Sequence, residues 1–161
     1  MYYEVAGDTV DALWADVMLK TPVEHRGKKH VAFTKWNISW RFWWYDSNET
    51  CDISKVETEL DVTYTLPRLD RSVAIPDQVI ARWEDYFAAL FDHEQGHKDI
   101  GLKAAHEIQN KLASMAPRKT CRQLELDANE IARNVIDRYV RFEKAYDRST
   151  SHGLNTGAVF P

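Results

Sequence analysis

The chain has little of several residue types that mark specialised classes of protein. Its 161 residues include two cysteines, five prolines and six glycines, too few for a disulfide-dense scaffold or a collagen-like repeat. No apolar run approaches the roughly 20 residues of a membrane-spanning helix, so we expect no integral membrane segment. There is no internal repeat and no low-complexity linker. With 44% hydrophobic and 29% charged residues, the composition predicts one globular domain over residues 1–161.

The sequence also lacks an excess of positive charge. The formal net charge is −4 and the sequence pI is about 5.9. One short basic stretch, residues 25–30, is explained most simply as a solvated turn. We therefore expect no nucleic-acid partner.

No targeting signal is visible at the start of the sequence, where residues 1–4 contain neither a charged leader nor an apolar core. The two cysteines, Cys51 and Cys121, have no close Cys or His neighbour at the spacing of a metal site. They are either one disulfide, which would close a loop of about 70 residues, or two unlinked thiols of a cytosolic protein. We expect the disulfide.

Alternating side chains predict a β-hairpin over residues 34–44 and 56–66. In both segments the even positions are mostly apolar and the odd positions mostly polar, which is typical of strands with one buried face. Residues 46–49 between them have turn composition, so the strands are expected to be antiparallel. Three tryptophans, Trp36, Trp40 and Trp44, lie on the apolar face and are interpreted as core rather than as a sugar-binding platform.

Three other segments follow the helical period of 3.6 residues: 9–19, with Thr9 as its N-cap, a long one from 77 to about 115, and 121–146. Prolines 22 and 117 are expected to end helices, and Pro67 to end the second strand. Residues 2–6 form a candidate edge strand, and residues 154–161 a loose tail. Two strands followed by two long helices predict an α+β fold, with an antiparallel sheet packed against the helices.

The long helical segment contains the sequence His93-Glu94-Gln95-Gly96-His97. Residues four apart in a helix differ by 400° of rotation, so both imidazoles face the same side and can reach one zinc ion. Both histidines also occupy positions of the apolar seam, where a buried polar group without a partner would cost several kcal/mol. Glu94 is placed to take a proton from a zinc-bound water. We therefore predict a zincin-like metal helix rather than two surface histidines.

A hydrolytic zinc site has a third protein ligand and keeps the fourth position for water. The extended metzincin motif would place Gly at position 100 and His at 103, where this chain has Ile100 and Lys103. The ligand must come from another segment, and the candidates are Glu130, Asp147 and His152, with His25 and His30 as more remote ones. His152 stands out because it follows a helix end beside Gly153, which lets the backbone bend.

Two further motifs accompany the His-Glu-x-Gly-His sequence. A Thr-x-Trp-x-x-x-Trp pattern lies in the first strand, at Thr34, Trp36 and Trp40. A terminal Tyr-Asp-x-x-Thr-x-His-Gly pattern is formed by Tyr146, Asp147, Thr150, His152 and Gly153. With these motifs the chain resembles, over nearly its whole length, a bacterial family of uncharacterised proteins described as predicted secreted zinc-dependent proteases. The resemblance implies bound zinc, a secreted or periplasmic location, and His152 as the third ligand.

The leading hypothesis is a zinc metallopeptidase that acts on a peptide or protein substrate with Glu94 as general base. Tyr146 is a candidate donor to the oxyanion or else a core aromatic, and Asp147 and Thr150 are candidates for supporting the metal ligands. One alternative is an amidase or endopeptidase that acts on peptidoglycan peptides with the same centre. The other is a non-catalytic metal-binding or interaction module, which Glu94 disfavours because a structural zinc site needs no base.

Overall fold

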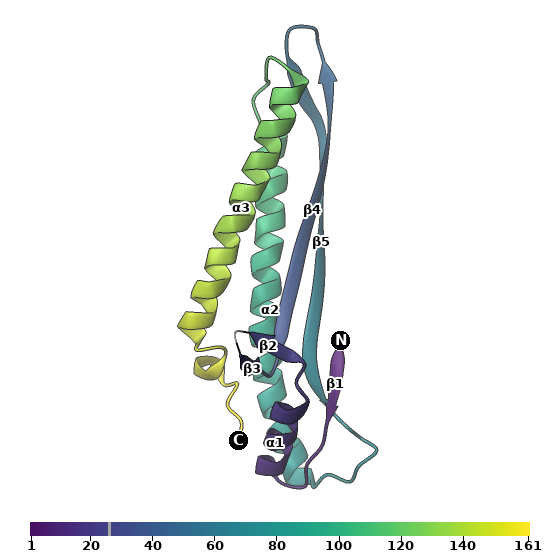
Figure 1. The fold of residues 1–161 in the computed structure, drawn as a ribbon, viewed down its shortest axis with the longest axis vertical. Coiled ribbons are helices and arrows are strands. Elements are labelled where there is room, and N and C mark those ends of the chain that lie inside the picture. The colour runs from purple at the N-terminus through teal and green to yellow at the C-terminus, as the bar shows by residue number, and fades with distance from the viewer. Residues whose placement is uncertain (26) are drawn as a thin grey trace. The chain divides into compact units, whose positions relative to one another are not determined.

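The computed structural model describes residues 1–25 and 27–161 (Figure 1). Its elements in chain order are β1 (Tyr2–Val5), α1 (Val10–Lys20), β2 (Val23–His25), β3 (Lys28–His30), β4 (Phe33–Asp46), β5 (Cys51–Leu69), α2 (Asp77–Ala113), α3 (Cys121–Thr150) and the 3-10 turn η1 (Leu154–Thr156). This content confirms the α+β prediction. Within the described residues, no helix combines the length and apolarity needed to cross a bilayer.

The larger sheet has three strands in the order β1-β5-β4, and β4 and β5 form the predicted hairpin with longer arms than expected. Pro67 does not end β5, which corrects the prediction. The N–H groups of Leu66 and Asp70 donate to β1, at Met1 O (3.1 Å) and Val5 O (2.8 Å). N–H groups alternate in direction along a strand, so the backbone nitrogen of Pro67 faces away from β1. The missing N–H group of Pro67 therefore costs no hydrogen bond to β1. β1 pairs with β5 in parallel, so the sheet is mixed.

A second, two-stranded sheet consists of β2 and β3, which pair antiparallel with His25 opposite Lys28. It holds most of the basic stretch that was interpreted as a solvated turn. His25, Lys28 and Lys29 are exposed and His30 is half-buried, while Arg26 lies outside the described residues.

The described residues divide into two compact units. The first comprises Met1–Lys35, Val62–Lys98 and Tyr146–Pro161, and the second Trp36–Asp61 and Asp99–Ala145. The long elements β4, β5, α2 and α3 therefore each contribute a part to both units.

The core of the first unit includes the apolar face of α1 and the C-terminal segment. Thr9 caps α1 as predicted, accepting from Ala12 N at 3.1 Å. The expected loose tail is wrong: Phe160 is 6% exposed, and its ring lies 5.6 Å from that of Trp83 and 5.0 Å from that of Tyr86, centroid to centroid. A segment this short shows no hydrophobic period, so its anchoring side chain was not recognisable as core.

The second unit has its own core between the hairpin and the two long helices, centred on Ile38, Ile108, Leu112 and Val135. Trp36 and Trp40 pack against this core at the edge, and their indole N–H groups donate to Glu143 and Asn129. Trp44 is 41% exposed, so its assignment to the core is wrong. Trp44 lies near the end of β4 that leads into the hairpin turn, and its ring centroid is 5.7 Å from that of Phe42.

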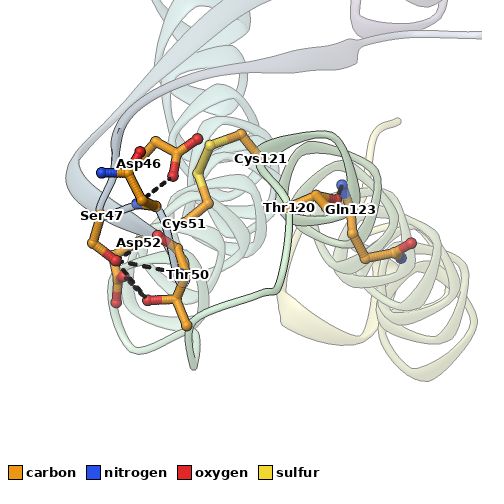
Figure 2. Close-up of a disulfide and its surroundings, with 9 residues drawn as sticks. Asp46, Ser47, Thr50, Cys51, Asp52, Thr120, Cys121 and Gln123 are labelled. Carbon is orange, nitrogen blue, oxygen red and sulfur yellow. Dashed lines mark hydrogen bonds between the residues drawn. A yellow bond between two sulfur atoms is a disulfide. The ribbon is translucent and has the colours of Figure 1, made fainter.

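The predicted disulfide between Cys51 and Cys121 is present and joins the first residue of β5 to the first residue of α3 (Figure 2). Backbone hydrogen bonds reinforce the link, since Cys51 and Arg118 exchange N–H to O contacts of 2.7 and 3.0 Å. Disulfides persist in oxidising compartments and are rare in the cytosol, so this bond indicates an oxidising environment.

Reduction of this disulfide should lower the free energy of unfolding by about 4 kcal/mol, because the bond closes a loop with a sequence separation of 70. Urea unfolding of the oxidised chain, the reduced chain and the Cys51→Ser/Cys121→Ser double variant measures the difference. The double variant should match the reduced chain. Equal unfolding midpoints for all three would contradict the prediction.

Candidate metal site

The two histidines of the central motif lie one turn apart on α2, in the part of that helix that belongs to the first unit. His93 is 4% exposed and His97 is 8% exposed, as their places in the apolar seam predict. Their rings are 5.0 Å apart and nearly perpendicular, at 89°. Both Nε2 atoms point to one acceptor on α3.

That acceptor is Oδ1 of Asp147, which lies 3.3 Å from His93 Nε2 and 3.0 Å from His97 Nε2. One ligand atom of each residue lies within 4.8 Å of the others. In a tetrahedral zinc site with bonds of about 2.0–2.1 Å, ligand atoms are about 3.3 Å apart. The donor types and their spacing therefore fit a single metal ion.

Asp147 reaches this position because α3 is longer than predicted and continues to Thr150. Burial raises the pKa of the Asp147 carboxyl, but the hydrogen bonds with His93 and His97 and the nearby His152 outweigh it and hold the pKa well below its usual range. The carboxylate is thus ionised at any physiological pH. The sequence offered Asp147 both as a candidate third ligand and as a support for the ligands, and the structure places its Oδ1 next to Nε2 of both histidines.

His152, the ligand implied by the resemblance, lies at the rim of this group. It follows Ser151 and precedes Gly153, and all three have positive φ (51°, 54° and 88°), which turns the chain back after α3. Its Nδ1 is 3.5 Å from Asp147 Oδ1, and its side chain is 62% exposed. Its ring also contacts His30, with centroids 5.7 Å apart.

Among the described residues, the group of side chains that could hold a metal consists of His93, His97 and Asp147, without the other candidate ligands. Glu130 belongs to the second unit, and His25 is exposed on β2. His30 lies beside His152 as described above. Burial and the neighbouring His152 and His25 lower its pKa, and the carboxylate of Asp147 offsets part of that shift.

Glu94 lies next to His93 and is almost completely buried, at 5% exposed. Its Oε2 accepts a hydrogen bond from the Thr34 hydroxyl at 2.5 Å, and the same hydroxyl lies 3.2 Å from the Glu94 carbonyl oxygen. Burial raises the pKa of Glu94, and the hydrogen bond from Thr34 and the two histidines offset part of that rise. The result is a carboxylate with more than ordinary basicity beside the metal-ligand group.

The contact of Thr34 with Glu94 was not predicted from the sequence, although Thr34 is a position of the strand motif. The signal was present, since a threonine on the apolar face of a strand needs a buried partner for its hydroxyl. That partner is 60 residues away on α2, and only the tertiary structure identifies it.

Thr150 and Tyr146 lie behind His93. The Thr150 hydroxyl donates to Tyr146 O at 2.8 Å, and its oxygen lies 3.4 Å from His93 Nδ1. With its own proton used, that oxygen can accept from Nδ1–H, so Nε2 is the nitrogen that would bind a metal in place of its hydrogen bond to Asp147. The Tyr146 hydroxyl, a candidate oxyanion donor, donates to His93 O at 3.3 Å.

Residues 1–153 match the model of a family described as "Bacterial protein of unknown function (DUF922)". The chain belongs to this family. The match includes every residue of the candidate site and confirms the bacterial part of the resemblance; the description names no activity. No curated protein and no solved structure matches the chain significantly.

In chelator-treated protein, Glu94→Gln should increase the free energy of unfolding at neutral pH. The native state binds more protons than the unfolded state between the ordinary pKa of 4.5 and the raised native pKa, so ionisation of Glu94 costs stability as the pH rises. The gain should be small below about pH 4.5 and grow with pH until the native pKa is passed. Urea unfolding over this range measures it.

Glu84→Gln, at an exposed position on the same helix, is the control and should show no such trend. A stability difference for Glu94→Gln that does not change with pH would refute the raised pKa.

Proposed function

We propose that the first unit carries the zinc centre of a metallopeptidase, held by His93, His97 and Asp147. The observation that supports this most directly is the convergence of two imidazole Nε2 atoms on one carboxylate oxygen, at 3.3 and 3.0 Å. Imidazole and carboxylate are ligands that zinc accepts, and three protein ligands leave one position open for catalysis.

Asp147 is assigned the third position because its oxygen already lies within hydrogen-bond distance of both histidines. His152 was the ligand implied by the family resemblance, and its Nδ1 is 3.5 Å from the same oxygen, on an exposed side chain. The two assignments make different predictions for metal affinity.

Zinc in such a centre polarises a carbonyl group and lowers the pKa of a water molecule towards 7. Glu94 supplies the base: its raised pKa suits it to accept a proton from the attacking water near neutral pH and to pass it to the leaving amine. The Thr34 hydroxyl holds one oxygen of this carboxylate in place. Thr150 keeps His93 in the tautomer that presents Nε2 to the metal.

The proposed substrate is a peptide or protein, and peptides of the cell wall are the alternative that the same centre would serve. Glu94 argues against a purely structural metal site, because burying an ionisable carboxyl at such a site is costly and supplies no ligand. The disulfide supports a secreted or periplasmic place of action.

Asp147→Ala should weaken zinc binding more than about 100-fold, whereas His152→Ala should weaken it by no more than about 10–100-fold, the range for residues that support ligands. Zinc content by mass spectrometry and affinity by chelator competition measure both. Asp137→Ala, an exposed carboxylate on the same helix, is the control. The opposite order of effects would assign the third position to His152.

Glu94→Gln should retain zinc and lose hydrolysis by about 10²–10⁴-fold, equivalent to about 3–5 kcal/mol of barrier, because the amide cannot act as a base. Casein, a mixed peptide library and purified cell wall are the substrates, and Glu84→Gln is again the control. A zinc-loaded wild type that is inert on all three would remove the peptidase proposal. Full activity in Glu94→Gln would show that another group is the base.

A further inference from the structure

We propose that Tyr146 is a positioning residue of the metal site, and that position 96 is glycine because the Tyr146 hydroxyl occupies the space of a side chain there. This inference rests on the proposed zinc centre. It assigns Tyr146 a role in holding the ligands rather than in contacting the substrate.

The phenol ring of Tyr146 contacts both histidines of α2. It is stacked on the His93 ring, with centroids 5.0 Å apart and planes 10° apart, and meets the His97 ring edge-on at 5.1 Å and 88°. The torsion that turns an imidazole is broad, so rotamer preference alone does not fix where its nitrogen points. Packing against the rigid ring of Tyr146 fixes the orientation of both imidazoles.

The other end of the phenol lies over Gly96. A Cβ atom at position 96 would be 2.2 Å from the Tyr146 hydroxyl oxygen and 2.5 Å from Cζ, closer than real Cβ contacts ever are. Gly96 lies inside a helix and has no positive φ, so glycine is needed there for the space that it leaves and not for backbone freedom. A glycine costs about 1 kcal/mol relative to alanine within a helix, which a packing requirement of this kind explains.

The position of Tyr146 also determines that of Asp147, the next residue of α3. The phenol hydroxyl donates to His93 O at 3.3 Å, and the Tyr146 carbonyl accepts from Thr150 at 2.8 Å. The phenol therefore joins the last turns of α3 to α2, together with the contacts that Asp147 and Thr150 make to the two histidines. Because metal–ligand distances tolerate about 0.2 Å, a displaced phenol would move Asp147 out of range.

A core aromatic without this role would affect stability but not metal affinity. The chain offers a matched control in Gly101, which lies on the same helix but in the second unit. A Cβ there would be 2.8 Å from Cγ of Trp36, a comparable clash with another aromatic ring. Gly101→Ala therefore reproduces the steric cost without contacting the metal-ligand group.

The test uses the full chain with its disulfide and four variants: Gly96→Ala, Gly101→Ala, Tyr146→Leu and Tyr146→Phe. Zinc affinity is measured by competition with a chromophoric chelator, the cobalt(II)-substituted protein by its visible absorption spectrum, and folding by circular dichroism and thermal unfolding. Gly96→Ala and Tyr146→Leu should bind zinc about 10–100-fold more weakly and alter the cobalt spectrum. Tyr146→Phe keeps the ring and loses only the hydrogen bond to His93 O, so it should lose clearly less affinity than Tyr146→Leu. Gly101→Ala should lower only the unfolding temperature.

Wild-type zinc affinity in folded Gly96→Ala and Tyr146→Leu would overturn the inference and leave the zinc centre intact. Equal losses in Gly101→Ala and Gly96→Ala would overturn it too, since general destabilisation would then explain both. If Gly96→Ala does not fold, the contrast between Tyr146→Leu and Tyr146→Phe decides. A wild type that binds no zinc would reject the metal centre itself, and the positioning role with it.

Discussion

The sharing of one carboxylate oxygen by two buried imidazoles is the interaction on which the candidate site depends. Asp147 Oδ1 lies 3.3 and 3.0 Å from the two Nε2 atoms, and both histidines are buried, at 4% and 8% exposed. Removing polar groups of this kind from water is costly unless a cation or a proton lies between them. The end of α3 carries this oxygen, and the ring of Tyr146 packs against both histidines that share it.

The pKa values of two carboxyl groups in the same site are shifted in opposite directions, for different physical causes. Asp147 has cationic or hydrogen-donating neighbours that stabilise its ionised form, so its pKa falls. Glu94 is buried with one hydroxyl donor, so its pKa rises. Environments that separate the pKa values of neighbouring carboxyls are a recurring way to assign one group to binding and the other to proton transfer. The pair therefore suits a ligand and a base.

Much of the fold was predictable because it follows from periodicity. The alternation of apolar and polar residues predicted the hairpin. The 3.6-residue period of apolar positions predicted the helices and the inward orientation of His93 and His97. The end of α3 was not predictable, because residues 147–150 are polar and have turn composition, although the helix continues through them to Thr150. The pairing of Thr34 with Glu94 and the burial of Phe160 are contacts between segments distant in sequence, and no local pattern reports them.

The helix α3 is tied at both of its ends, by links of different chemistry. Its first residue, Cys121, is held covalently to the start of β5, and its last turn carries Asp147, which meets α2 across a sequence separation of 50. A metal bound at Asp147 would act as a reversible counterpart of the disulfide. It would stabilise the folded chain in proportion to the logarithm of the free metal concentration. One end of α3 then responds to the redox state of its surroundings and the other to their metal content. The helix would loosen from a different end in a reducing medium than in a metal-poor one.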